Sequence, residues 1–148
     1  FSYNGFRQGI CYWGVTEKMK NEDVELILPL KPEYVGVARL TASAIASRMG
    51  FDVENIEDIK VSISEVCNKL VTANKSPDIN YSIVYKIFTD KLIIAFKCCD
   101  SSLKTHFTES DDNGIHGILI ISALMDEVKL HDDGDYLLSM SKYIREIM

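Results

Sequence analysis

Two kinds of hydrophobic pattern divide the chain from Val24 onward. Three stretches place apolar residues three and four positions apart, which is the spacing of a helix with one buried face. Five shorter runs are rich in β-branched and aromatic residues, which is typical of strands. The expected helices cover residues 32–49, 54–70 and 114–125, and the expected strands cover residues 24–30, 81–88, 91–99, 126–131 and 136–143.

The residues between these segments support the same division. Pro29 near the end of the first strand favours an edge position, because proline cannot donate a hydrogen bond to a neighbouring strand. Pro32 is suited to the first turn of a helix, and Gly50 to its end. Thr89 and Asp90 form a short turn, so residues 81–99 are expected to be an antiparallel hairpin. The order strand, helix, helix, hairpin, helix, hairpin predicts a two-layer α+β sandwich, with a mostly antiparallel sheet and helices on one face.

The first 18 residues differ from the rest of the chain. They hold five aromatic residues but neither a cationic start nor a continuous apolar stretch, so they do not resemble a signal peptide. We expect residues 1–18 to be a tag or an upstream extension and residues 19–148 to form a single domain. An aromatic arm that contacts a partner is the alternative interpretation.

Composition narrows the class of protein. With 148 residues, 47% hydrophobic and 26% charged, the chain is long enough to bury a core as one globular domain. It lacks an apolar run of the roughly 20 residues that a membrane span needs, so no membrane contact is expected. The net charge of −6 argues against direct binding of nucleic acid and suits a basic protein partner. The four cysteines lack zinc or redox spacing, and we expect free thiols and a cytoplasmic location.

Three features are the parts of a nucleotide pocket. Glu65 lies on the second helix, Asp100 directly follows the expected strand at residues 91–99, and Gly114 and Gly117 open the third helix. Each feature also has an ordinary explanation. Glu65 is spaced to pair with Lys69 one helical turn on, for about 0.2–0.5 kcal/mol. An aspartate after a strand is usually a turn residue, and two glycines near a helix are usually a turn and a cap.

The chain resembles a known family in three separated segments, residues 32–40, 56–67 and 124–128. The family is the bacterial anti-sigma factors of the serine-kinase type, from the general-stress branch, and the resemblance covers nearly all of residues 19–148. It implies the Bergerat ATP-binding fold that histidine kinases and gyrase-like ATPases share. It also implies a homodimer that holds a sigma factor inactive and uses ATP to phosphorylate a serine on an anti-anti-sigma antagonist.

The resemblance assigns a role to individual residues. Glu65 matches the general base, Asp100 the acceptor of the adenine amino group, and Arg39 the arginine that contacts the sigma factor and the antagonist. The expected ATP-binding residues, including those that depart from the family pattern, are Asn68, Lys69, Asp100, Ser102, Gly114 and Gly117. Ser102 stands where the family has a glycine. The segment between Asp100 and Gly114 is about a dozen residues, shorter than the ATP lid of relatives, with phosphate contacts expected from Thr105, Ser110, Asn113 and His116.

Lys69 is the most serious departure, because relatives place there an asparagine that binds Mg²⁺. A lysine has no lone pair for a cation, and Asn68 points about 100° away around the helix. No metal ligand is therefore assigned, and Mg²⁺ is doubtful as a cofactor beside ATP. Two functions stay open: an anti-sigma factor that is also a serine kinase, and a degenerate anti-sigma binding module with weak or no ATP chemistry. A structural domain without nucleotide is a third.

Overall fold

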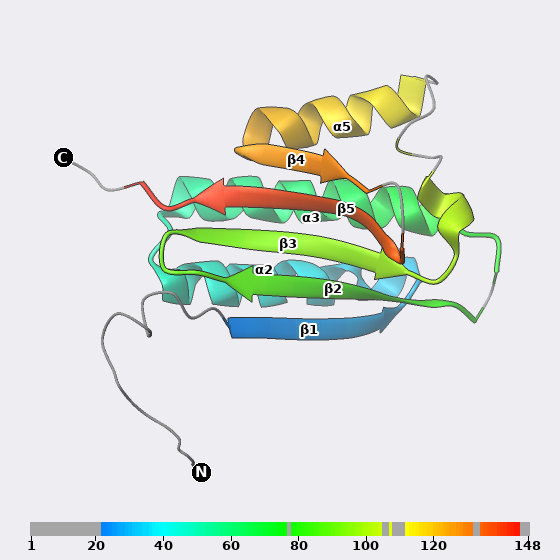
Figure 1. Ribbon diagram of the computed structural model, residues 1–148, viewed down its shortest axis with the longest axis horizontal. Coiled ribbons are helices and arrows are strands. Elements are labelled where there is room, and N and C mark those ends of the chain that lie inside the picture. The colour runs from blue at the N-terminus through cyan, green and yellow to red at the C-terminus, as the bar shows by residue number, and fades with distance from the viewer. Residues whose placement is uncertain (1–21, 77, 105–106, 108–111, 132–133, 146–148) are drawn as a thin grey trace, which may run out of the picture.

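The structure is a computed structural model that describes residues 22–76, 78–104, 107, 112–131 and 134–145. Residues 1–18, expected to be a tag or extension, lie outside the described residues. Within them, five strands form one sheet and three α-helices pack on it (Figure 1). None of the helices in these ranges is long and apolar enough to cross a membrane.

The sheet is antiparallel throughout. Its strands are β1 (Glu22–Pro29), β2 (Asn80–Ile87), β3 (Lys91–Cys98), β4 (Glu127–Leu130) and β5 (Tyr136–Tyr143). They are ordered β1-β2-β3-β5-β4, and each neighbouring pair runs antiparallel. β1 and β4 are the edge strands of this sheet. The edge position of β1 is the one that the proline near its end predicts. The last strand of the chain inserts between β3 and β4, so both hairpins join into one sheet.

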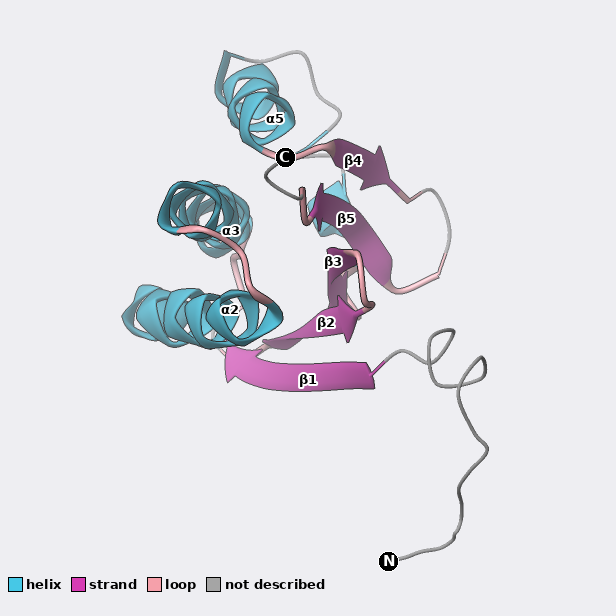
Figure 2. Cartoon of the chain, turned by 90° about the vertical axis from the view of Figure 1, so that its left-hand side faces the viewer, coloured by secondary structure: helices cyan, strands magenta, loops and turns pink. Residues whose placement is uncertain are grey.

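The helices cover one face of this sheet (Figure 2). A short 3₁₀ turn, η1 (Pro32–Tyr34), leads into α2 (Val35–Met49), which is followed by α3 (Val53–Ala73) and later by α5 (Asp112–Leu124). Figure 2 shows α2, α3 and α5 on the same side of the strands. The predicted two-layer α+β sandwich is therefore confirmed.

Local signals set the boundary between α2 and α3. Gly50 ends α2 in the left-handed conformation, with φ of 100°, which glycine adopts without steric cost. Two residues later the Asp52 carboxylate accepts a hydrogen bond of 2.8 Å from the Asn55 backbone N–H and caps the start of α3. The chain thus reverses in three residues, and α2 and α3 pack side by side on the sheet.

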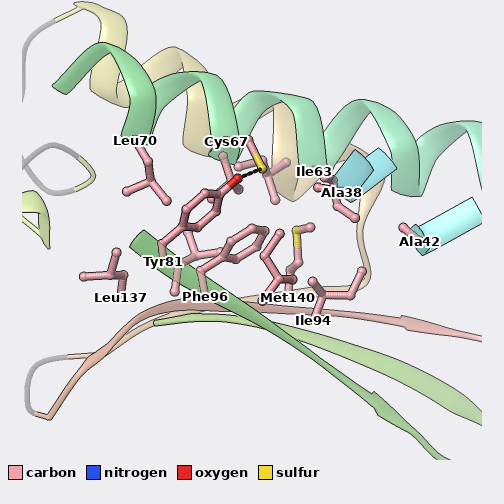
Figure 3. Close-up of a cluster of buried hydrophobic side chains, with 14 of the residues drawn as sticks. Ala38, Ala42, Ile63, Cys67, Leu70, Tyr81, Ile94, Phe96, Leu137 and Met140 are labelled. Atoms are coloured by element: carbon pink, nitrogen blue, oxygen red, sulfur yellow. Dashed lines mark hydrogen bonds between the residues drawn. The ribbon is translucent and has the colours of Figure 1, made fainter. Parts of the chain in front are cut away.

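Two tyrosines of β2 connect the sheet to these helices. The Tyr81 hydroxyl donates to Cys67 Sγ of α3 at 3.3 Å (Figure 3). The Tyr85 hydroxyl donates to the Ala38 carbonyl of α2 at 3.0 Å. Both rings are buried, so an unpaired hydroxyl there would be costly. Burial also raises the pKa of the Cys67 thiol to about 11, although the Tyr81 hydrogen bond acts to lower it. Cys67 is therefore a protonated core thiol rather than a reactive one.

The mostly polar residues 100–113 predict a loop between the strand at residues 91–99 and the third helix, but this segment contributes to the core. Its first part forms a 3₁₀ helix, η2 (Ser101–Lys104). Leu103 and Phe107 are only 2% and 5% exposed and join the main hydrophobic cluster. The expectation was wrong because two isolated apolar residues among polar ones give no helical or strand period. Their burial fixes the start of this connection against the sheet.

Asp126, which follows α5, provides a test of the fold near the sheet edge. Its carboxylate accepts hydrogen bonds from the Tyr143 backbone N–H and from Arg145. Burial raises the pKa of Asp126, but these two donors and the charges of Arg145 and Lys142 outweigh it, so the pKa lies below its ordinary value. A carboxyl with a depressed pKa contributes stability above its unfolded pKa of about 3.9 and loses it as the pH falls through the folded value.

We therefore expect Asp126→Asn to lower the free energy of unfolding by about 1–3 kcal/mol at pH 7. The difference from the unmutated protein should shrink as the pH falls below about 4. Urea unfolding at several pH values measures this, with Asp78→Asn, an exposed turn aspartate, as the matched control. A difference that stays constant down to pH 3 would contradict the assigned ionic role.

Candidate functional site

Three elements meet at one end of the sheet. The C-terminal half of α3, the end of β3 with the following η2, and the first half of α5 all lie toward the right-hand end of Figure 1. α3 and α5 pack against each other and run in opposite directions. The predicted site residues of these three elements are therefore placed at the same end of the molecule.

The buried stripe of α3 sets the direction of its site residues. Its apolar side chains at helical spacing are fully buried, namely Ile59, Ile63, Val66 and Leu70. Glu65 and Lys69 lie one turn apart on the flank of this stripe and are half-buried, whereas Asn68 is exposed. The ordinary ion pair between Glu65 and Lys69 is not among those that the described residues form. Both charges of this flank are thus left for other contacts.

Lys69 lies against α5. Gly117 is buried, and a methyl group in place of its hydrogen would lie 3.9 Å from Lys69 Cδ. This is an ordinary van der Waals distance, so the lysine stem passes over the α5 backbone at the glycine. The stem of Lys69 therefore lies beside the first half of α5.

Gly114 and Gly117 both lie inside α5 rather than ahead of it. Because α5 begins at Asp112, the N–H of Gly114 belongs to the first four of the helix, which have no partner within it. The N–H of Gly117 lies beyond them. Thr105 and Ser110 fall outside the described residues. Asn113 and His116 are residues of α5, and the structure describes only their backbone.

Asp100, two residues after the end of β3, is half-buried. Its Oδ1 accepts hydrogen bonds from the Ser102 backbone N–H at 3.0 Å and from the Ser102 hydroxyl at 2.6 Å. The carboxylate therefore has the ordinary turn role that the sequence also allowed, since it caps η2. That capping fixes the carboxylate in one orientation. Contact with an adenine amino group stays a prediction.

The described side chains do not fit a divalent cation. No group of three or more His, Cys, Asp or Glu side chains gathers among them in a metal-binding arrangement. At the position of the expected ligand, Lys69 supplies a positive charge and no lone pair. An anionic phosphate, by contrast, fits an ammonium next to a helix start. Among the described side chains, Lys69 is therefore suited to a phosphate group and not to a metal ion.

Arg39, the expected partner-binding residue, is exposed on α2. Its neighbours Val37 and Leu40 are 42% and 71% exposed. α2 lies on the other side of α3 from α5 (Figure 2), so this surface is separate from the candidate nucleotide site. Apolar side chains beside an exposed arginine are typical of a protein-binding surface.

Sequence reasoning gave no indication of a cavity at the other end of the sheet. A cavity of about 590 Å³ lies between the end of α2 and the start of β1, lined by residues that include Glu22, Arg48, Met49 and Phe88. These residues are at the end of the sheet opposite Asp100 (Figure 1). None of the predicted site residues lines it, because the pattern of the sequence does not reveal which strand ends and helix ends adjoin.

Comparison with known proteins supports a nucleotide site. Residues 28–142 match the family described as histidine kinase-like ATPase domain. A serine-protein kinase RsbW of Oceanobacillus iheyensis is 38% identical in an alignment that covers 86% of this chain and 91% of the relative. The proteins of the same name from Bacillus cereus and Bacillus subtilis are 36% and 32% identical, covering 84% and 85% of this chain and 86% and 89% of the relatives.

Gly117 offers a test of this geometry that needs no ligand. Gly117→Ala should increase the free energy of unfolding by about 0.5–1 kcal/mol, because alanine favours the helix and its methyl group meets Lys69 at an ordinary distance. Gly117→Val should lose that gain, since its branched side chain meets the lysine stem. Urea unfolding measures both. A destabilised alanine variant would show that α5 approaches α3 more closely than described.

Proposed function

Since the chain belongs to the histidine kinase-like ATPase family, and within it to the serine-protein kinases named RsbW, we propose that it is an anti-sigma factor that phosphorylates an antagonist protein. The resemblance to anti-sigma factors of the serine-kinase type is confirmed by these relatives. ATP is the phosphate donor and a serine hydroxyl of an anti-anti-sigma antagonist is the acceptor. The proposed site of action is the cytoplasm, where sigma factors bind RNA polymerase.

The observation that carries the proposal is the contact of Lys69 with Gly117. In this contact the stem of Lys69, one turn after Glu65, meets the first half of α5, toward the end of the sheet where β3 ends. Asp100 would hold the adenine amino group through a carboxylate already oriented by Ser102. Lys69 and the N–H groups at the start of α5 would hold the phosphates.

In the proposed reaction Glu65 acts as the general base. Its carboxylate accepts the proton of the acceptor serine, and the serine oxygen bonds to the γ-phosphorus of ATP while the bond to the β-phosphate oxygen breaks. The products are phosphoserine, ADP and the proton on Glu65. Lys69 lies one turn from Glu65 and balances negative charge at the phosphates, although an ammonium cannot bridge two phosphate oxygens as a metal ion does.

The alternative is a degenerate module that binds partners but transfers phosphate slowly or not at all. Lys69 favours it, because the metal-ligand position is occupied by a cation. Glu65 favours the kinase, because its side chain is half-buried and is not held in an ion pair with Lys69. The two functions share the nucleotide site and differ only in transfer.

Lys69→Asn decides between them. The unmutated protein should bind ATP with an affinity that depends little on Mg²⁺, and the variant should bind more tightly with Mg²⁺ than with a chelator. Phosphorylation of the antagonist should rise in the variant, and the added change Glu65→Ala should abolish the gain. Labelled ATP and phosphoserine detection measure transfer.

Lys69→Gln is the matched control. It removes the charge as Lys69→Asn does, but its amide group lies at the end of a longer side chain. Rapid Mg²⁺-dependent phosphorylation by the unmutated protein would rule out the degenerate module. A Lys69→Asn variant with unchanged metal dependence would show that this lysine does not occupy the metal-ligand position.

We also propose that the chain is a homodimer and that the surface around Arg39 binds the sigma factor. The exposed Val37 and Leu40 beside the arginine, together with the open edge of β1, support a protein partner on this side of the molecule. This surface needs neither Glu65 nor Lys69, so partner binding survives in both functions.

Arg39→Glu should weaken capture of the sigma factor by about 2–5 kcal/mol if the arginine is paired and desolvated there. Arg48→Glu, a change of the same charge on the same helix, is the matched control. Titration of labelled sigma factor measures both, and sedimentation at micromolar concentration measures the dimer. Equal capture by the unmutated protein and Arg39→Glu would remove the arginine from the surface.

A further inference from the structure

A buried lysine joins α5 to α3 at the end of the molecule far from the candidate nucleotide site. Lys142 of β5 is 8% exposed and stands on the core-facing side of its strand, in line with the fully buried Leu138 and Met140. Lysine is rarely buried to this degree unless it is paired. Its presence among apolar neighbours therefore calls for specific partners.

Those partners belong to two different helices. Lys142 Nζ lies 3.5 Å from Asp58 Oδ2 in the first half of α3. The same ammonium donates a hydrogen bond to the carbonyl of Leu124, the last residue of α5. Carbonyls at a helix end have no partner within the helix, and a cation there is favoured by the helix dipole. One side chain of the sheet thus holds both helices.

The bridge lies opposite the Lys69–Gly117 contact. Asp58 and Lys69 are 11 residues apart on α3, about 16 Å along its axis. Leu124 and Gly117 are likewise at different turns of α5. Because the two helices run in opposite directions, α5 is attached at its last residue through Lys142 and meets Lys69 in its first half. The position of Leu124 therefore helps to set the direction of the α5 axis, and with it the positions of Gly114 and Gly117.

We propose that Lys142 is a positioning residue for the phosphate half of the nucleotide site, an inference that rests on the proposed function. It fixes the end of α5 against α3, so that Gly114, Gly117 and Lys69 face the phosphates together. Asp100 belongs to the end of β3 and does not depend on α5. Loss of the Lys142 contacts with Asp58 and Leu124 should therefore lower the affinity for the phosphates and leave the affinity for adenosine unchanged.

The experiment compares ADP with adenosine, both measured by competition against a fluorescent ADP at a temperature where every variant is folded. Lys142→Met keeps the length of the side chain and removes the charge and the donor. It should weaken ADP binding about tenfold and leave adenosine binding unchanged, because small misplacements of positioning groups have effects of this size or larger. Lys142→Arg should retain most of the ADP affinity.

Two further variants keep the test independent of folding. Lys142→Met with Asp58→Leu removes both charges of the buried pair, which usually preserves stability, and should show the same loss of ADP affinity. Arg145→Met removes an exposed cation from the same end that pairs with Asp126 rather than with either helix, and should change neither ligand. An equal loss of ADP and adenosine affinity, or none, would overturn the proposal.

Amide hydrogen exchange without nucleotide tests the bridge separately from the proposed function. Residues 117–124 of α5 should exchange faster in Lys142→Met than in the unmutated protein, whereas the second half of α3 should not change. If the unmutated protein binds neither ADP nor adenosine, the proposed function fails while this exchange result still stands. Unchanged exchange in α5 would show that Lys142 does not hold the helix.

Discussion

The burial of one stripe of α3 against the sheet is the constraint on which the site depends. Ile59, Ile63, Val66 and Leu70 are fully buried, and they allow α3 only one rotation about its axis. That rotation turns Glu65 and Lys69 toward the side where α5 packs. The hydrogen bond from Tyr81 of β2 to Cys67 of α3 links the sheet to the helix and supports the same rotation. A helix that slipped by one residue would move both charged side chains by about 100°.

The proposed nucleotide site draws on three elements of the fold. α3 supplies Glu65 and Lys69, η2 orients Asp100 through Ser102, and α5 supplies its glycines. α5 packs against α3 and also lies beside β4, the strand that follows it in the chain. The proposed role of Lys142 follows from this arrangement, because the lysine holds the end of α5 whereas Asp100 is oriented by η2. The arrangement also leaves the α2 surface around Arg39 separate from the candidate nucleotide site.

The hydrophobic pattern predicted the elements and the fold class because each helix and strand carries its own period. Local signals such as Pro32 and Gly50 placed the ends of α2 to within a few residues. The pattern did not predict the insertion of β5 between β3 and β4, since register between distant strands depends on packing and not on either strand alone. It did not predict the burial of Leu103 and Phe107, because these two residues follow no helical or strand period. It did not predict the burial of Lys142 either, although this lysine lies two residues after the apolar Met140, on the same side of the strand. Glu65 and Lys69 were found together because their spacing is local, whereas the approach of Lys69 to Gly117 required the antiparallel pairing of α3 with α5.

The central claim is that Glu65, Lys69, Asp100 and Gly117 border one nucleotide site at one end of the sheet. Backbone amide chemical shifts during titration with ADP in the presence of a chelator test it most directly. The shifts should change at residues 65–69, at residues 100–103 and around Gly117, and remain constant at Arg48 and Phe88 beside the opposite cavity. Changes confined to that cavity, or no saturable change at millimolar ADP, would contradict the account.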